Sequence, residues 1–318
     1  MLDSAPIRSH VAPRPSSRPR TAALTAAALV GFAANSLLCR MALGTRLADA
    51  ATFTSIRIGS GALVLLLLHR ASGRSRPALA SAGDWPSAAT LFAYAAAFSF
   101  AYLRIGAGVG ALLLFGAVQV TMLAWALGRG ERPGPAQWAG LLAALVGLVA
   151  LLRPGLAAPD PAGAGLMVAA GVAWGLYSLR GRSTGQPLAA TASNFTRAMP
   201  FALALSVATA SGSHLEWRGA LLAAVSGALT SGIAYSFWYA ALPGLTGTQA
   251  AIVQLAVPAL AAAGGVAFLG EDLTARVAWC GTAILGGVGL AVLHRRPPAS
   301  HGDRSRTSGR LDADRISG

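Results

Sequence analysis

The chain contains no lysine, and all 25 of its basic residues are arginine. A phosphate-binding Gly-Lys loop is therefore excluded, because such a loop needs a lysine to contact the phosphates. Cysteine is also scarce: Cys39 and Cys280 both fall inside apolar stretches, where cysteine behaves as a small apolar residue. The sequence thus offers no disulfide or metal-binding framework, and we expect neither a metal nor a cofactor.

Ionisable groups are missing from the apolar stretches. The histidines at positions 10, 69, 214, 294 and 301 fall in tails, in loops or at helix edges, and none of the 11 acidic residues falls inside a predicted span. A membrane-embedded enzyme needs a nucleophile beside a base, and a proton relay needs a buried carboxylate or imidazole. The sequence therefore argues against both an enzyme and an obvious proton relay.

Charged residues make up 11% of the chain, well below the ~25% of soluble domains, while hydrophobic residues make up 54%. The mean hydropathy is +0.57. A water-soluble protein of 318 residues could not hide this much apolar surface. The sequence predicts an all-α, polytopic membrane protein.

About twenty apolar residues are needed to cross a bilayer as a helix. Ten stretches are predicted to do so, at about 21–41, 51–69, 86–103, 107–127, 136–152, 163–180, 191–210, 218–240, 245–268 and 274–293. Arginines outside these spans gather in the two tails and in the loops on the same side as the tails. The positive-inside rule therefore predicts that both termini are cytoplasmic and that the protein resides in the plasma membrane.

The second half repeats the charge pattern of the first at an offset of 140 residues. Arg40, Arg57 and Glu131 recur as Arg180, Arg197 and Glu271. Each half holds five spans, an odd number, so the second half enters the membrane from the opposite side. Residues 21–153 and 163–293 are thus predicted to be two inverted five-helix repeats, an arrangement typical of secondary transporters.

The tails at residues 1–20 and 294–318 are rich in arginine, proline, serine and glycine, which predicts disordered cytoplasmic segments. They carry part of the net charge of +14. Attraction to anionic lipid accounts for such charge, and nucleic acid is not an expected partner. The expected partners are the bilayer and a small-molecule substrate, while the sequence indicates no oligomeric state.

Several motifs resemble those of a known family. Residues 235–295 show an aromatic helix end (YSFWY), a short turn, a helix centred on Pro258, the pair Gly270-Glu271, and Trp-x-Gly at Trp279. The first half gives a weaker copy in GRGERPGPAQWAGLL, with Val118 in place of the proline. Together with Arg57 in FTSIRIGSG, this pattern over about 21–293 resembles the drug/metabolite transporter superfamily, specifically EamA-type transporters with two five-helix repeats. The resemblance implies export or exchange of small metabolites, amino acids or drugs.

Arg57 and Arg197 are the charges placed deepest in predicted spans, roughly 10 Å from the helix start. A charge at such depth costs at least ~2.5 kcal/mol and usually faces a partner or a wet cavity. One interpretation is a cationic lining that receives a carboxylate or another anionic group. The alternative is a guanidinium that binds the carbonyls of a neighbouring helix end.

Pro258 marks a second candidate site, since a proline inside a helix leaves the carbonyl four residues earlier without its N–H. That residue is Gln254, whose side chain is also polar. Interrupted helices commonly mark solute sites in transporters. A kink satisfied by neighbouring side chains is the alternative.

Aromatic and amide side chains could form the rest of a binding site. Tyr235 and Trp238 share one face of the eighth span, Tyr94 lies in the third and Trp174 in the sixth. Asn35 and Asn194 are candidate polar wall residues in the first and seventh spans. Such groups line adaptable pockets, although they also serve as packing and interfacial anchors.

The function predicted from these features is secondary transport, by alternating access, of a small organic metabolite, amino acid or drug across the plasma membrane. Exchange or downhill efflux is favoured over transport that is coupled to protons, because no proton relay is evident. A membrane-embedded lipid-modifying enzyme and a non-transporting sensor or assembly subunit are the alternatives.

Overall fold

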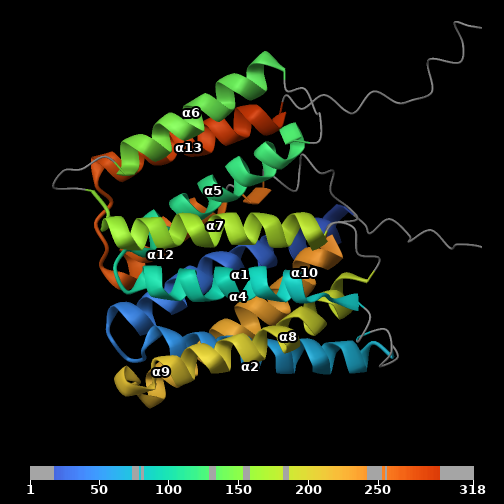
Figure 1. Ribbon diagram of the computed structural model, residues 1–318. Helices are drawn as coiled ribbons and strands as arrows, with labels where there is room; N and C mark the ends of the chain where they lie inside the picture. The colour runs from blue at the N-terminus through green and yellow to red at the C-terminus, as the bar shows by residue number, and fades with distance from the viewer. Residues whose placement is uncertain are drawn as a thin grey trace, which may run out of the picture.

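The structure is a computed structural model that describes residues 18–73, 79, 82–128, 134–152, 158–181, 186–241, 253–254 and 256–293 (Figure 1). Most of both predicted tails lies outside these ranges, and so does Glu131. The described chain is built from helices, in agreement with the predicted all-α class.

Each of the ten predicted spans contains a helix. The first half holds α1 (Arg18–Gly44), α2 (Ala50–Ala71), α4 (Trp85–Tyr102), α5 (Ala107–Gly128) and α6 (Pro135–Leu152). The second half holds α7 (Pro161–Gly181), α8 (Pro187–Ala208), the short η1 (Ala210–Gly212), the continuous run α9 (Trp217–Val225), η2 (Ser226–Ile233) and α10 (Ala234–Ala241), then α12 (Ala256–Leu269) and α13 (Ala275–Leu293). By length and composition alone, α1, α2, α7 and the stretch Trp217–Trp238 could each cross a membrane. The prediction of a polytopic membrane protein is confirmed.

Acidic residues mark where several helices begin. Asp49 accepts a hydrogen bond from the Thr52 backbone N–H at 2.9 Å at the start of α2, and Asp84 accepts one from Ser87 at 2.7 Å at the start of α4. Asp160 accepts one from Gly163 at 2.7 Å at the start of α7. A carboxylate satisfies the free N–H groups of a first helical turn and complements the helix dipole. Capping by acids therefore keeps these charges at helix ends, where water can reach them.

The helices pair across the two halves in a regular way (Figure 1). α6 packs on α13, α2 packs on α8, and α5 packs on α12. α1 packs on the run α9–η2–α10 and on α12, while α7, its counterpart in the second half, packs on α4 and on α5. Exchanging the two halves thus reproduces the same pairings. The pair α6–α13 lies at one edge of the molecule, and α2, α8 and α9 lie at the opposite edge (Figure 1).

The eighth span contains a π-helix, η2, between two α-helical segments. Its wider turns bring Gly227 against α2, where a Cβ on residue 227 would overlap the Ser60 hydroxyl and the Arg57 carbonyl oxygen. π-helical turns inside α-helices often occur at functional sites. Here the π-helix permits close backbone contact beside the buried Arg57.

We expect Gly227→Ala to lower the free energy of unfolding by roughly 1–3 kcal/mol, because the added methyl group overlaps backbone and side-chain atoms of α2. Gly165→Ala in α7 is the matched control, since a Cβ there meets no atom within 4 Å. The control should be neutral or slightly stabilising. Thermal unfolding of the purified variants in detergent measures both, and equal unfolding temperatures would contradict the close contact.

Candidate functional site

A cavity lies where helices of both halves meet. It is lined by Phe32, Asn35 and Ser36 of α1, Tyr94 and Phe98 of α4, Leu114 and Phe115 of α5, Trp174 of α7, Thr230 of η2, Tyr235 of α10, and Gln254. Inside the cavity, the centre of a water molecule can move through about 20 Å³. This is room for about one or two waters. The cavity is therefore small in this conformation.

Aromatic residues from five spans make up six of the eleven residues that line the cavity. The Trp174 ring lies 4.8 Å from the Tyr94 ring and 5.2 Å from the Tyr235 ring, measured between centroids. Phe32 meets Tyr235 edge-on at 5.6 Å, and Phe98 lies 5.3 Å from Tyr94. These separations fall in the 4.5–7 Å range of favourable ring pairs. The wall is thus a connected set of rings suited to a flat, apolar solute.

Asn35 is the polar centre of one side of the cavity, and its side chain is buried. Its Oδ1 accepts hydrogen bonds from the Ser226 hydroxyl at 2.7 Å and from the Thr230 hydroxyl at 3.0 Å, both on η2. The Cys39 thiol also lies 4.0 Å from this oxygen. These bonds fix the orientation of the amide, because the oxygen faces the π-helix.

Arg57 lies directly behind the aromatic wall and is not one of the lining residues. It is 2% exposed, and its Nη2 donates to the Tyr94 hydroxyl at 3.0 Å. The guanidinium carbon lies over the Tyr94 and Phe98 rings, at 5.3 and 4.9 Å from their centroids. Its Nη1 lies 4.0 Å from the Cys39 sulfur. Arg57 therefore contacts the cavity through two rings that line it.

One ion-pair cluster lies beyond the cavity on the side where α1 ends. Arg40 contacts Glu271 at 3.4 Å and donates to the Tyr102 carbonyl at 2.9 Å. Both carboxylate oxygens of Glu271 accept from the Ala107 backbone N–H, at 2.9 and 2.8 Å, where α5 begins. This cluster ties together the ends of α1, α4, α5 and α12. It lies one helical turn past Ser36, which lines the cavity.

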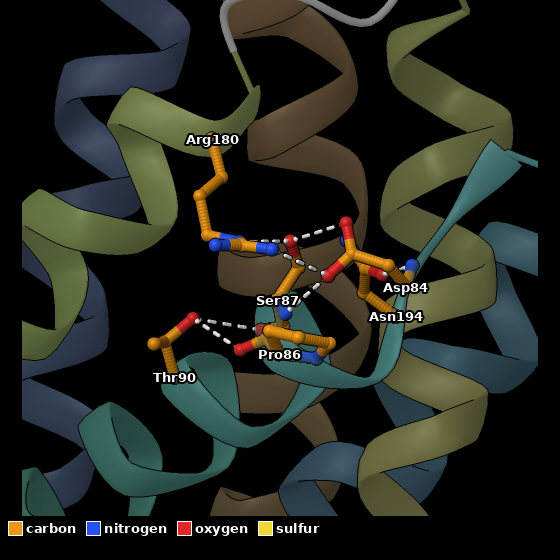
Figure 2. Close-up of polar contacts among 6 residues, drawn as sticks. All are labelled: Asp84, Pro86, Ser87, Thr90, Arg180 and Asn194. Carbon is orange, nitrogen blue, oxygen red and sulfur yellow. Dashed lines mark hydrogen bonds and ion pairs between the residues drawn. The ribbon is translucent and has the colours of Figure 1, made fainter.

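A second cluster lies at the start of α4 (Figure 2). Arg180, at the end of α7, contacts Asp84 at 3.1 Å and donates to the Ser87 hydroxyl at 3.1 Å. The side-chain oxygen of Asn194, on α8, accepts from the Asp84 backbone N–H at 3.1 Å. Arg180 follows the cavity residue Trp174 by six positions on α7, which is about 9 Å along a helix. Arg40 and Arg180, equivalent in the repeat, thus form the two clusters.

The structure brings five of the ten predicted site residues together at the cavity: Asn35, Tyr94, Trp174, Tyr235 and Gln254. Arg57 lies behind them. Trp238 packs edge-on against Phe32 at 6.0 Å, and Pro258 is buried in the first turn of α12. Asn194 belongs to the second cluster, and Arg197 lies beside it, bonded to the Ser193 hydroxyl and adjacent to Gly83.

The sequence did not identify every residue of the cavity wall. Phe32, Leu114, Phe115 and Thr230 were not predicted as site residues. The repeat does not mark Phe32, because the residue at the offset of 140 is Val172. Nothing in the sequence marked Thr230, since its position depends on the π-helix. Among the described residues, no three side chains of His, Cys, Asp or Glu gather as a metal site would require.

Asp84 is the ionisable group of the second cluster whose protonation is most clearly perturbed. Partial desolvation disfavours its charged form, but hydrogen bonds from the Ser87 N–H and hydroxyl, with the charge of Arg180, outweigh that effect. The pKa of Asp84 is therefore lowered from its usual value. The interaction stabilises the folded state above the unfolded pKa of about 3.9 and is lost as pH falls through the lower folded pKa.

Comparisons with known proteins agree with this architecture. Residues 161–293 match the EamA-like transporter family. An uncharacterized protein of Pseudomonas aeruginosa is 52% identical over 277 residues, which cover 87% of this chain and 96% of that protein. A protein of known crystal structure is similar in fold, with a TM-score of 0.58 at 22% identity, and the match covers 85% of this chain and 99% of that chain.

We expect Asp84→Asn to lower the unfolding temperature at pH 7 by about 1–3 °C, because the ion pair with Arg180 is half-exposed and the amide oxygen can still cap α4. The difference from wild type should shrink as pH falls below about 4. Asp272→Asn, at an exposed position, is the control and should change little. A difference that persists unchanged at pH 3 would contradict the ionised Asp84 seen here.

Proposed function

The chain belongs to the EamA-like transporter family, and from this premise we propose that it is a secondary transporter that moves a small organic solute by alternating access. The solute would bind in the cavity described above. Its entry and exit would require the helix ends on either side to separate in turn.

The observation that carries this proposal is which helices contribute the residues that line the cavity. The lining residues come from the first and sixth spans, the third and eighth, and the fourth and ninth, which are three pairs related by the repeat. A site at the junction of two repeated halves is accessible from either side when one half rocks against the other. This placement supports transport over a purely structural role for the cavity.

The two ion-pair clusters supply contacts that could break and re-form. The paired side chains are 27% and 20% exposed for Arg40 and Glu271, and 44% and 52% exposed for Arg180 and Asp84. Partly exposed pairs are worth about 1 kcal/mol or less. Each side could therefore open at small energetic cost. We propose that one cluster separates while the other stays formed.

Energy coupling through a protein proton carrier is not favoured by the described residues. The carboxylates among them lie outside the helices, at caps and turns. We therefore propose exchange or downhill efflux, with any coupling supplied by the charge of the solute. Cytoplasmic placement of both termini follows from the arginine distribution, and a plasma-membrane location is part of the same proposal.

The wall residues provide a direct test of the proposal. We expect Gln254→Ala and Asn35→Ala each to lower initial flux in proteoliposomes about fivefold or more, because each removes a polar group from the cavity. Gln119→Ala in α5 is the matched control: Gln119 is an amide that does not line the described cavity, and its loss should leave flux near wild type. Parental flux in both wall variants, with normal folding, would contradict this site.

Inverted halves predict that equivalent loops face opposite sides of the membrane. In a variant without Cys39 and Cys280, Glu131→Cys should react with an impermeant thiol reagent only from the cytoplasmic side. Asp272→Cys, next to the equivalent Glu271, should react only from outside. Labelling of intact cells and of inside-out vesicles measures this. Reaction of both positions from the same side would contradict the inverted repeat.

A further inference from the structure

The charged group nearest the cavity wall is Arg57, which is buried in the first half of α2. Arginine stays protonated at any physiological pH. The groups that hold this guanidinium are neutral: the Tyr94 hydroxyl, the Cys39 thiol, and the ring faces of Tyr94 and Phe98. The ion pairs found among the described residues are all at helix ends. A fixed positive charge therefore lies directly behind the wall, and no described carboxylate neutralises it.

The contact of Arg57 with the Tyr94 and Phe98 rings affects which charge the cavity can bind. Aromatic cavities often bind organic cations, because the face of each ring is electronegative. Here the guanidinium already lies over the Tyr94 and Phe98 rings. A second cation against the same rings would meet the charge of Arg57 across a single ring at low dielectric. The aromatic wall would otherwise attract cations, but the charge of Arg57 repels them.

Two polar groups that line the cavity, the Tyr94 hydroxyl and the Asn35 amide, have hydrogens that no described group accepts. The Tyr94 oxygen accepts from Arg57, so the hydrogen of that hydroxyl remains available. The Asn35 oxygen accepts from Ser226 and Thr230, so the amide N–H groups remain for a ligand. An ionised carboxylate only accepts hydrogen bonds. The donors and the buried charge therefore both match an anionic group.

We infer that this transporter selects small organic anions, carboxylates in particular, with a flat apolar body, and that Arg57 determines this charge preference through Tyr94 and Phe98. The inference rests on the proposed transport function. The anionic group would bind the Tyr94 hydroxyl and the Asn35 amide, and the apolar body would lie among Phe32, Trp174 and Tyr235. Arg57 is a specificity-determining residue that need not touch the solute.

Binding of three solutes of similar size tests the charge preference directly. Phenylacetate, phenylacetamide and 2-phenylethylammonium share a ring and differ in charge. We expect purified wild-type protein in detergent to bind phenylacetate at least about tenfold more tightly than the neutral amide, and the cation most weakly. Thermal stabilisation as a function of solute concentration gives each affinity. Equal or tighter binding of the cation would overturn the inference.

Variants of Arg57 identify the source of the preference. Arg57→Met should abolish the advantage of phenylacetate over the amide, whereas Arg57→Lys should keep a reduced advantage because it retains the charge. Arg218→Met, at an exposed arginine stacked on Trp217, is the control and should behave as wild type. If Arg57→Met does not fold, the affinities of wild type and Arg57→Lys for the three solutes decide whether Arg57 sets the preference. An unchanged preference in a folded Arg57→Met would overturn the assignment.

Flux measurements separate this inference from the proposed function. Benzenesulfonate and phenyltrimethylammonium are permanently charged and cross bilayers slowly, so they suit proteoliposomes. We expect uptake of the anion to exceed that of the cation by at least about tenfold. Equal uptake of both would leave transport standing and overturn the anion preference. Binding of phenylacetate with the predicted ranking, but no flux of either probe, would support the preference and contradict transport.

Discussion

A guanidinium in the interior of a helix bundle must be held by groups that compensate for its lost hydration, since a charge at this depth costs at least ~2.5 kcal/mol. Within the described part of the chain, Arg57 meets this requirement without a carboxylate, through one hydroxyl, one thiol and two ring faces. The same contacts also fix the positions of the Tyr94 and Phe98 rings. Those rings in turn position Trp174, which stacks on Tyr94 and Tyr235. The shape of the cavity therefore depends on how one charge is buried.

The close approach of η2 to α2 is part of the same arrangement. Gly227 lets the π-helix lie against the Arg57 backbone, and Ser226 and Thr230 on the same segment hold Asn35. A regular α-helix over 226–233 would rotate these hydroxyls relative to Asn35, because its turns are shorter. The irregular segment thus links the buried charge on α2 to the polar wall on α1.

The fold could be predicted from the sequence to a large extent, since apolar length alone marked every span. The candidate site could be predicted only in part. Asn35, Tyr94, Trp174, Tyr235 and Gln254 stood out as polar or aromatic residues inside apolar spans, and tertiary packing places all five at one cavity. Thr230 depends on a helix type that no local pattern announces. Arg197 has the depth of Arg57, but only the packing of α8 against α4 places it beside Gly83.

The difference between Arg57 and Arg197 shows how a duplicated scaffold can combine symmetry with selectivity. Both residues occupy the same position in the repeat, and α2 packs on α8 so that the two helices are neighbours. Arg57 lies behind the aromatic wall, whereas Arg197 lies near the cluster of Asp84 and Arg180 at a helix end. In the proposed transport cycle, motion between two access states would need equivalent helix pairings, and the described helices have them. Selection of a solute would need an asymmetric set of donors and charges. On this proposal the first half keeps its arginine beside the cavity, while the second places its arginine near the ion pair of Asp84 and Arg180.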